Sequence, residues 1–347
     1  MKFAIVGAGT IAHLRKAAID VLSGGSLAGV YDMVPDRATA LAGTARTYAG
    51  FDDLLADAQV DTVILCTPPD SHAEMAIAAV QAGKHVIVEK PMASTAEDCK
   101  RMIAAAHDAD RVLTVGFNHR YFPAIKEMRA SIASGRLGEL SHVRGYSGHT
   151  GLSEFKAEWM YSKDVMGGGA LLDNGIHMID LVHHLMGPVE DVYGLTQDKT
   201  WQLDRAEDNA LALMRGTTGT IGSVGASWTE WKGYHFYVEA YGTLGMARAY
   251  YAPMYFMEVT MDRPGGARRK RRNFYLPQIF AEKFKGWQST AVQTFVEEMQ
   301  DFVALTEGRG ANGVIATGQD GFRAIEIAQA VYSASDTGQR VVLESLG

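Results

Sequence analysis

The chain has 347 residues, of which 47% are apolar and 21% charged, and this length and composition are typical of a globular protein with two domains. Its net charge of -7 argues against general nucleic-acid binding, because a phosphate backbone would be repelled on average. The chain has only two cysteines, Cys66 and Cys99, no cleavable signal pattern and no uncharged apolar run of membrane-spanning length. We therefore expect a cytoplasmic protein without a disulfide framework that binds neither membranes nor nucleic acids.

A glycine turn directly follows the first predicted strand. Residues 2–6 are expected to form a buried strand, and Gly7-Ala8-Gly9-Thr10-Ile11-Ala12 then opens an amphipathic stretch that reaches Leu22. Strand, glycine turn and helix in this order are typical of a dinucleotide site. Gly7 permits the tight turn, and Gly9 lets a pyrophosphate approach the backbone. The amides at the start of the helix, with Thr10 and Ile11, are expected to meet the phosphates.

A carboxylate ends the second predicted strand, at residues 27–31. In dinucleotide sites, an acidic residue about 20 residues after the glycine turn binds the adenosine ribose hydroxyls. Asp32 follows Gly9 at a similar separation. A carboxylate at this place repels a 2′-phosphate, which favours NAD over NADP. Arg37 lies a few residues further on, and we expect it to be a solvated residue in the first turn of a helix at 35–42.

Three further buried strands are predicted at residues 62–66, 85–88 and 111–115, and helical stretches alternate with them. This alternation predicts a doubly wound parallel sheet. Glu89 and Lys90 directly follow the strand at 85–88. Because charges are costly to bury, we expect both at the carboxyl edge of the sheet, where such folds bind their ligands. Lys90 is thus a candidate proton donor or acceptor, and an ordinary ion pair at the strand end is the alternative.

In the second half, a predicted helix after the glycine triplet 167–169 carries Asp173 and His177. They are four residues apart and so share one helix face. Asn174 and Gly175 between them are poor helix formers, which indicates close packing rather than helix propensity. A zinc site built from Asp173, His177 and Asp180, with His183 or His184 nearby, is an alternative. No further ligand follows at zinc-site spacing, and the dinucleotide pattern favours another chemistry, so no metal is expected.

The rest of the chain predicts a sheet and two long helices. Apolar and polar residues alternate in five strand-like runs separated by glycine-containing turns, at 209–214, 220–228, 234–240, 245–250 and 255–261. With helices on one face, the other face needs a cover, and we predict a homodimer or homotetramer through it. The basic run 268–272 is expected to be a solvated hairpin segment. Amphipathic helices are predicted at 288–305 and 314–333, the last one bracing the sheet.

Together these motifs resemble the Gfo/Idh/MocA family of NAD(P)-dependent oxidoreductases. The resemblance rests on the glycine turn, Thr67-Pro68 with His72, Gly83-Lys84-His85-Val86 through Glu89-Lys90-Pro91, and Gly116-Phe117-Asn118-His119-Arg120 followed by Pro123. It implies an N-terminal Rossmann domain, here residues 1–118, followed by an α+β domain with a large open, mainly antiparallel sheet, here residues 119–347. It also implies a sugar, cyclitol or related polyol as the substrate.

The resemblance assigns roles to individual residues. The family's catalytic lysine, aspartate and histidine correspond to Lys90, Asp173 and His177. The expected cofactor-binding residues are Gly7, Gly9, Thr10, Ile11, Asp32, Thr67, Pro68, His72, Glu89, Lys90 and Asn118. Arg120, Trp159 and Lys163 are expected at the substrate. The family often has an arginine after this tryptophan, whereas here Met160 follows Trp159, and Lys163 is the candidate to replace that charge.

These residues suit hydride transfer between a secondary alcohol carbon and C4 of nicotinamide. Oxidation of the alcohol requires a base for the hydroxyl proton, and His177 is the expected base. Lys90 would stabilise the charge that develops on the oxygen, and Asp173 would orient Lys90 or the substrate. Two alternatives remain open. One is a glycoside hydrolase or lyase that uses NAD without net redox change, and the other is a catalytically silent dinucleotide-sensing regulator.

Overall fold

The computed structural model describes residues 1–154, 157–203, 206–310 and 313–344. The chain divides into two compact units, Met1–Tyr121 with Ala281–Phe322, and Phe122–Phe280 with Arg323–Gly347. The first unit thus extends slightly beyond the predicted boundary at residue 118. It also includes a late segment, Ala281–Phe322, that the sequence pattern assigns to the second domain.

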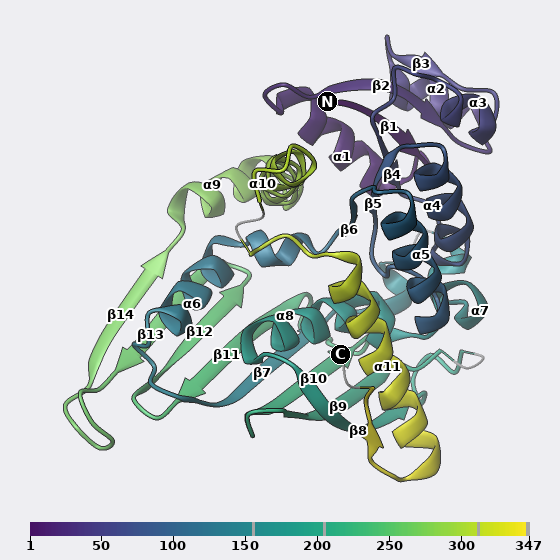
Figure 1. Cartoon of the computed structure of the whole chain (residues 1–347). Coiled ribbons are helices and arrows are strands. Elements are labelled where there is room, and N and C mark those ends of the chain that lie inside the picture. The colour runs from purple at the N-terminus through teal and green to yellow at the C-terminus, as the bar shows by residue number, and fades with distance from the viewer. Residues whose placement is uncertain (155–156, 204–205, 311–312, 345–347) are drawn as a thin grey trace. The chain divides into compact units, whose positions relative to one another are not determined.

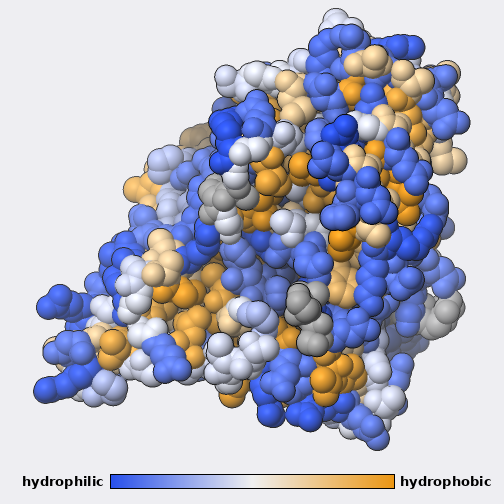
Figure 2. Space-filling model, in the orientation of Figure 1, coloured by the Kyte–Doolittle hydropathy of each residue, from blue (hydrophilic) through white to orange (hydrophobic). Residues whose placement is uncertain are grey.

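No helix among the described residues is long and apolar enough to span a bilayer. Hydrophilic residues, drawn in blue, cover most of the face visible in Figure 2, and apolar residues form smaller orange groups between them.

The first unit contains a six-stranded parallel sheet with the strand order β3-β2-β1-β4-β5-β6. This arrangement confirms the predicted doubly wound sheet, shown in purple to blue in Figure 1. Its inner strands are short, and β4 is buried along its whole length, as expected for strands covered on both faces. The strands are β1 (Lys2–Val6), β2 (Ser26–Tyr31), β3 (Arg46–Thr47), β4 (Thr62–Leu65), β5 (His85–Val88) and β6 (Leu113–Val115). The helices of residues 1–121 are α1 (Thr10–Val21), α2 (Pro35–Ala42), α3 (Phe51–Leu55), α4 (His72–Gln81), α5 (Ala96–Asp108) and the 3-10 turns Pro69–Ser71 and Asn118–Tyr121.

The late helix α10 (Gln288–Thr306) completes the core of the first unit. It packs against α1, and its Phe295, Met299 and Phe302 are buried with Phe3 and Ile5 of β1 in one apolar cluster. Burying side chains of this size stabilises the fold by about 1.5–3 kcal/mol each. This packing explains why residues far along the chain belong to the first unit.

The second unit contains a nine-stranded sheet with the order β14-β13-β12-β11-β7-β10-β9-β8-β15. Among these pairs only β7 and β10 run parallel, so the sheet is mainly antiparallel, as predicted (Figure 1). The strands are β7 (Leu140–Gly148), β8 (Val189–Gln197), β9 (Asn209–Gly216), β10 (Ile221–Ser227), β11 (His235–Gly242), β12 (Gly245–Tyr251), β13 (Tyr255–Thr260), β14 (Arg269–Phe274) and β15 (Val341–Val342).

Helices cover one face of this sheet. Helix α8 (Ile176–Met186) packs on β7 and β10, and α6 (Pro123–Ala133) packs on β12 and β13. Gly194 of β8 lies against Val331 of α11 (Gly318–Thr337), so the last helix packs on this sheet. The remaining helical segments of the described residues are the short α7 (Lys163–Met166), the 3-10 turns Gly151–Ser153 and Glu158–Tyr161, the π-helical turn Leu171–Gly175, and α9 (Leu276–Lys285).

Candidate active site

The glycine turn has the conformation that a dinucleotide site requires. Gly7 has a φ of 87°, and a Cβ on it would lie 2.8 Å from the backbone oxygen of Cys66, so only glycine fits there. A Cβ on Gly9 would meet nothing within 4 Å, which leaves space for a ligand above the backbone. Gly9 is also the N-cap of α1, and no side chain caps this helix. Its first amides are therefore suited to phosphate oxygens, and these residues fit the expected cofactor.

Asp32 lies against the same turn. Its Oδ2 accepts a hydrogen bond from the amide of Ala8 (2.6 Å), and its Oδ1 accepts one from the amide of Val34 (2.8 Å). The carboxylate is thus held beside the turn, where the sequence predicts the adenosine ribose. Arg37 is exposed on α2.

His72 joins two segments of the predicted cofactor edge. Its ring is completely buried; Nε2 lies 2.8 Å from the backbone oxygen of Thr67, and Nδ1 lies 3.1 Å from that of Pro91. Burial lowers the pKa of His72, so the ring favours the neutral form. The structure therefore places His72 as a brace between Thr67-Pro68 and Lys90-Pro91, with no exposed surface of its own.

A buried charge network includes Glu89, the residue that precedes Lys90. Arg15 of α1 donates from Nε to Glu89 Oε1 (2.6 Å) and from Nη1 to Glu298 of α10, and its guanidinium stacks 3.9 Å from the centroid of the Phe295 ring. Burial raises the pKa of Glu298 to about 7 against the opposing pull of Arg15. The sequence did not single out Arg15 or Glu298, because neither stands near Glu89 in the chain.

The other predicted residues of the first unit have defined partners. Asn118 is buried and donates to Thr294 Oγ1 of α10 (3.0 Å), and Arg120 is buried in an ion pair with Asp320 (3.0 Å). Lys90 is half-buried. Burial and the nearby Lys90 charge lower the pKa of His119 to about 3, so this histidine stays neutral beside the lysine. Arg120 thus has a structural partner where the resemblance implies a substrate contact.

In the second unit, the glycine triplet sets up the helix that carries Asp173. Gly167 ends α7 with a φ of 85°. A Cβ on Gly168 would overlap the Tyr332 hydroxyl, and one on Gly169 would come within 2.2 Å of the Glu207 backbone oxygen. The buried Glu207 carboxylate accepts the amides of Gly169 and Leu171, each at 2.8 Å, and the Tyr332 hydroxyl at 3.0 Å. Glu207 therefore caps the start of this helix, a role that the sequence analysis missed.

The helix itself is not regular. Leu171–Gly175 form a π-helical turn, and α8 starts at Ile176. Asp173 lies in the π-helical turn and His177 in α8, and both are buried. A π-helical turn has more residues per turn than an α-helix, so a separation of four residues does not by itself place the two side chains on one face. A Cβ on Gly175 would lie 2.7 Å from the Ala226 Cβ of β10, so the close packing predicted at this glycine is confirmed.

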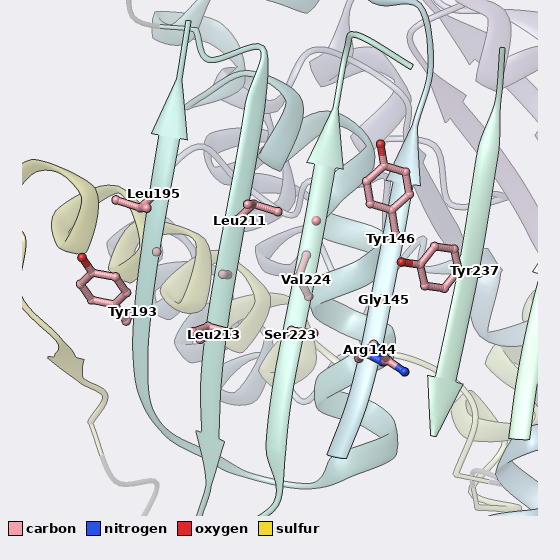
Figure 3. Close-up of a pocket in the computed structure, with 13 residues that line it drawn as sticks. Arg144, Gly145, Tyr146, Tyr193, Leu195, Leu211, Leu213, Ser223, Val224 and Tyr237 are labelled. Atoms are coloured by element: carbon pink, nitrogen blue, oxygen red, sulfur yellow. The ribbon is translucent and has the colours of Figure 1, made fainter. Parts of the chain in front are cut away.

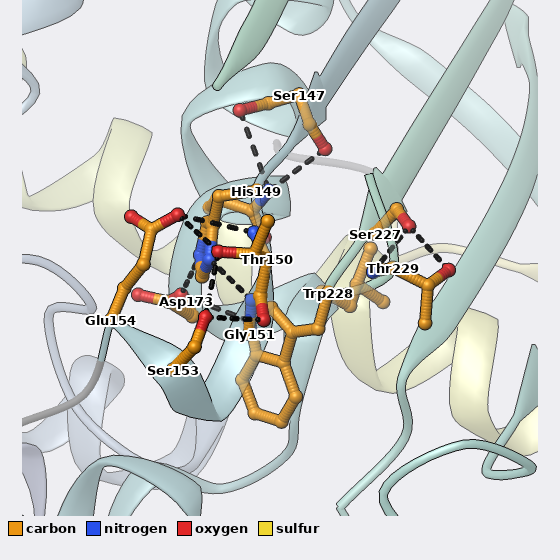
Figure 4. A network of polar contacts seen from close by, with 12 residues as sticks. Ser147, His149, Thr150, Gly151, Ser153, Glu154, Asp173, Ser227, Trp228 and Thr229 are labelled. Carbon is orange, nitrogen blue, oxygen red and sulfur yellow. Dashed lines mark hydrogen bonds and ion pairs between the residues drawn. The ribbon is translucent and has the colours of Figure 1, made fainter. Parts of the chain in front are cut away.

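Asp173 is the centre of a polar network that is shown in Figure 4. His149 Nε2 lies 2.8 Å from Asp173 Oδ2, and Trp228 Nε1 donates to the same oxygen at 3.0 Å. Asn174 next to it donates to the backbone oxygen of Ser147 (2.8 Å). His149 and Trp228 were not predicted from the sequence, since both directly follow strand ends that carry no recognisable motif.

The predicted substrate residues of the second unit lie on the segment before the triplet. Trp159 is 37% exposed in the turn Glu158–Tyr161. Lys163 opens α7 and has its Nζ 5.4 Å from the centroid of the Tyr332 ring. Among the described residues there is no group of three or more His, Cys, Asp and Glu side chains that could hold a metal ion.

Comparison with known proteins covers both units. A family model described as an oxidoreductase family with an NAD-binding Rossmann fold matches residues 1–117, and the Gfo/Idh/MocA C-terminal domain model matches residues 125–248.

An inositol 2-dehydrogenase from Salmonella typhimurium is 29% identical over 99% of this chain and 97% of its own length. A 1,5-anhydro-D-fructose reductase from Ensifer adhaerens is 27% identical over 99% of both chains. The crystal structure of the WlbA dehydrogenase from Bordetella pertussis, in complex with NADH and UDP-GlcNAcA, is 26% identical, with a TM-score of 0.82 over 99% of this chain and 98% of that one.

Proposed function

The chain belongs to the Gfo/Idh/MocA family of NAD-binding oxidoreductases, and we propose on this basis that it is a dehydrogenase or reductase of sugars, cyclitols or sugar derivatives. The observation that carries the proposal is the full-length similarity to enzymes named inositol 2-dehydrogenase and 1,5-anhydro-D-fructose reductase, which act on CH–OH groups or the corresponding carbonyls. Their substrates differ, so they support a substrate class and not one compound.

Lys90, Asp173 and His177 are the proposed catalytic residues. The nicotinamide ring, when bound, supplies the hydride acceptor or donor at its C4. His177 would take the hydroxyl proton, since histidine is the side chain that most readily exchanges protons near neutral pH. The Lys90 ammonium would stabilise negative charge on the substrate oxygen, and Asp173 would orient the lysine or a neighbouring hydroxyl. The support is the match to the family motifs and the half-buried state of Lys90.

NAD is the proposed cofactor in preference to NADP. The Asp32 carboxylate is held at the glycine turn by the amides of Ala8 and Val34, where a 2′-phosphate would meet a negative charge. The predicted cytoplasmic location is also kept as a proposal, and the two cysteines, both free thiols, are in keeping with it.

A homodimer or homotetramer through the open sheet face is proposed as the assembly. Figure 3 shows this face, where Leu195, Leu211 and Leu213 stand on β8 and β9 beside the aromatic rings of Tyr146 and Tyr237. Strand β10 lies between the leucine strands and the strands of the two tyrosines, and the side chains on these five strands line a shallow hollow of about 340 Å³. Exposed leucines on neighbouring strands are costly to leave in water, and a second copy would cover them.

The test of the function compares Lys90→Ala with wild type on a panel of myo-inositol, levoglucosan and related polyols. Reduction of NAD and of NADP is followed at 340 nm. We expect wild type to reduce NAD with at least one polyol, and kcat of Lys90→Ala to fall about 10²–10⁴-fold while NAD still binds. The matched control is Lys16→Ala, which removes a surface lysine of α1 that pairs with Asp20.

A Lys90→Ala enzyme with near-normal kcat would remove the lysine from the catalytic assignment. Product formation from a glycoside without net change in NAD would instead support the hydrolase or lyase alternative.

A further inference from the structure

Two side chains hold one oxygen of Asp173. His149 follows the end of β7, and Trp228 follows the end of β10. The nitrogen atoms of both side chains contact Asp173 Oδ2, at 2.8 Å and 3.0 Å, and all three side chains are buried (Figure 4). Two hydrogen bonds from different strand ends fix the plane of a carboxylate, which would otherwise rotate about its Cβ–Cγ bond.

A third contact determines where the proton of His149 lies. The backbone amide of Gly151 donates to His149 Nδ1 at 3.0 Å, so Nδ1 acts as an acceptor and carries no hydrogen. The ring proton is therefore on Nε2, which faces Asp173. In this arrangement His149 is a neutral donor, and it orients the carboxylate without cancelling its charge.

The main chain of His149 does not depend on this side chain. The His149 amide donates to the backbone oxygen of Ser227 (3.0 Å), and the amide of Glu230 donates to the backbone oxygen of His149 (3.1 Å). The turn that follows has its own bond from the Thr150 hydroxyl to Glu154 Oε1 (2.7 Å). A change of the side chain thus removes its contacts with Asp173 and Gly151 and leaves the local backbone in place.

We propose that His149, as the neutral Nε2–H tautomer, is a positioning residue that acts with Trp228 to hold the Asp173 carboxylate in its reactive orientation. The proposal rests on the proposed function, because it assigns Asp173 a part in the reaction. It assigns a different role to each nitrogen of the imidazole ring: Nε2 donates to the carboxylate, and Nδ1 accepts the Gly151 amide.

Two amide variants separate these roles. In His149→Gln the side-chain nitrogen reaches approximately the position of Nε2, so it keeps the donor to Asp173. In His149→Asn the side-chain oxygen lies near the position of Nδ1, so it keeps the acceptor for Gly151 and loses the donor. Trp228→Phe removes the second donor and keeps most of the ring.

The experiment measures kcat, KM and thermal stability of the full-length enzyme with NAD and the best polyol of the panel. We expect His149→Asn to lower kcat about 10- to 100-fold at unchanged KM for NAD, Trp228→Phe to do the same, and His149→Gln to stay within about threefold of wild type. An Asn variant as active as the Gln variant, or equal losses in both, would overturn the proposal.

A second measurement does not depend on activity. In a ¹⁵N spectrum of histidine-labelled protein, the signals that disappear in His149→Asn belong to this ring. We expect them to show a protonated Nε2 and an unprotonated Nδ1 at neutral pH. The opposite tautomer, or an imidazolium, would overturn the proposal even if the enzyme is a dehydrogenase. If the tautomer is as expected and no polyol is oxidised, the proposed function fails and not the geometry.

Discussion

At the scale of single residues, the proposed catalytic motif Glu89-Lys90 adjoins a buried charge network whose members are distant in sequence. Glu89 was predicted at a strand end, and the structure gives it Arg15 as its partner, 74 positions earlier. Arg15 in turn contacts Glu298, 283 positions later. Sequence patterns detect residues at helix or strand spacing, so they identified Glu89 and Lys90 but not these partners. His149 and Trp228 were not predicted for the same reason, because both are distant from Asp173 in the sequence.

The buried Glu298 predicts a pH dependence of stability. Its pKa is raised by burial from the ordinary 4.5 to about 7, so the folded protein keeps a proton that the unfolded chain releases between these pH values. The unfolding free energy should therefore fall as the pH rises from 4.5 to 7, by up to about 3 kcal/mol. Glu298→Gln should remove this part of the slope in denaturant unfolding measured from pH 5 to 8.

The matched control for this measurement is Glu307→Gln, at the exposed end of the same helix. It should keep the wild-type slope. If the profiles of wild type and Glu298→Gln run parallel, Glu298 does not titrate as described.

At the scale of elements, strands and helices with clear periodicity were predicted well. Strand β1 and helix α2 have the predicted bounds, and β9 to β13 each overlap their predicted runs. Strand β8 was not predicted, because Glu190, Asp191 and Gly194 interrupt its apolar alternation; Asp191 is paired with Arg215 and Arg340. The π-helical turn was also beyond prediction, since it depends on tertiary contacts of Glu207 and of the glycine triplet.

The close packing of the glycine triplet 167–169 predicts that Gly169→Ala destabilises the protein. The added Cβ would lie 2.2 Å from the Glu207 backbone oxygen and 2.5 Å from its nitrogen, and backbone atoms cannot move aside as a flexible side chain can. We expect a loss of about 2–4 kcal/mol in unfolding free energy by denaturant titration, with a fall in kcat because the turn that carries Asp173 shifts.

Gly50→Ala is a suitable control, because the nearest atom to its Cβ is Asp53 Oδ2 at 3.6 Å. If both variants are equally stable, the turn does not depend on close contact with Glu207.

At the scale of the whole chain, the sequence allowed a prediction of both sheets and of the family, because each rests on local patterns and on motif order. The composition of the two units was only partly predictable. Ala281–Phe322 joins the first unit through the packing of Phe295, Met299 and Phe302, which are also typical of a helix that covers the second sheet. Apolar periodicity shows that a helix buries one face but not which core receives it.

The exposed leucines on the open face of the second sheet predict that the protein assembles through this face. Leu211→Glu combined with Leu213→Glu places charges on two side chains that are 64% and 57% exposed in the single chain, so the monomer should stay folded. We expect wild type to sediment as a dimer or tetramer and this double variant as a monomer at the same concentration.

Leu276→Glu, at a leucine that is 54% exposed on α9, is the control and should assemble like wild type. A wild-type protein that sediments as a monomer would refute the proposed interface.

The late return of α10 has a consequence for how this protein is made and engineered. During translation β1 to β6 emerge early. Phe295, Met299 and Phe302, which complete the apolar cluster with α1, emerge only after strands β7 to β14 of the second sheet. The nascent nucleotide-binding half must therefore persist with the α1 and β1 side of this apolar cluster uncovered through most of translation. A fragment cut at Tyr121 would lack the α10 side chains permanently, so a stand-alone version of this half has to be built by grafting α10 back onto it.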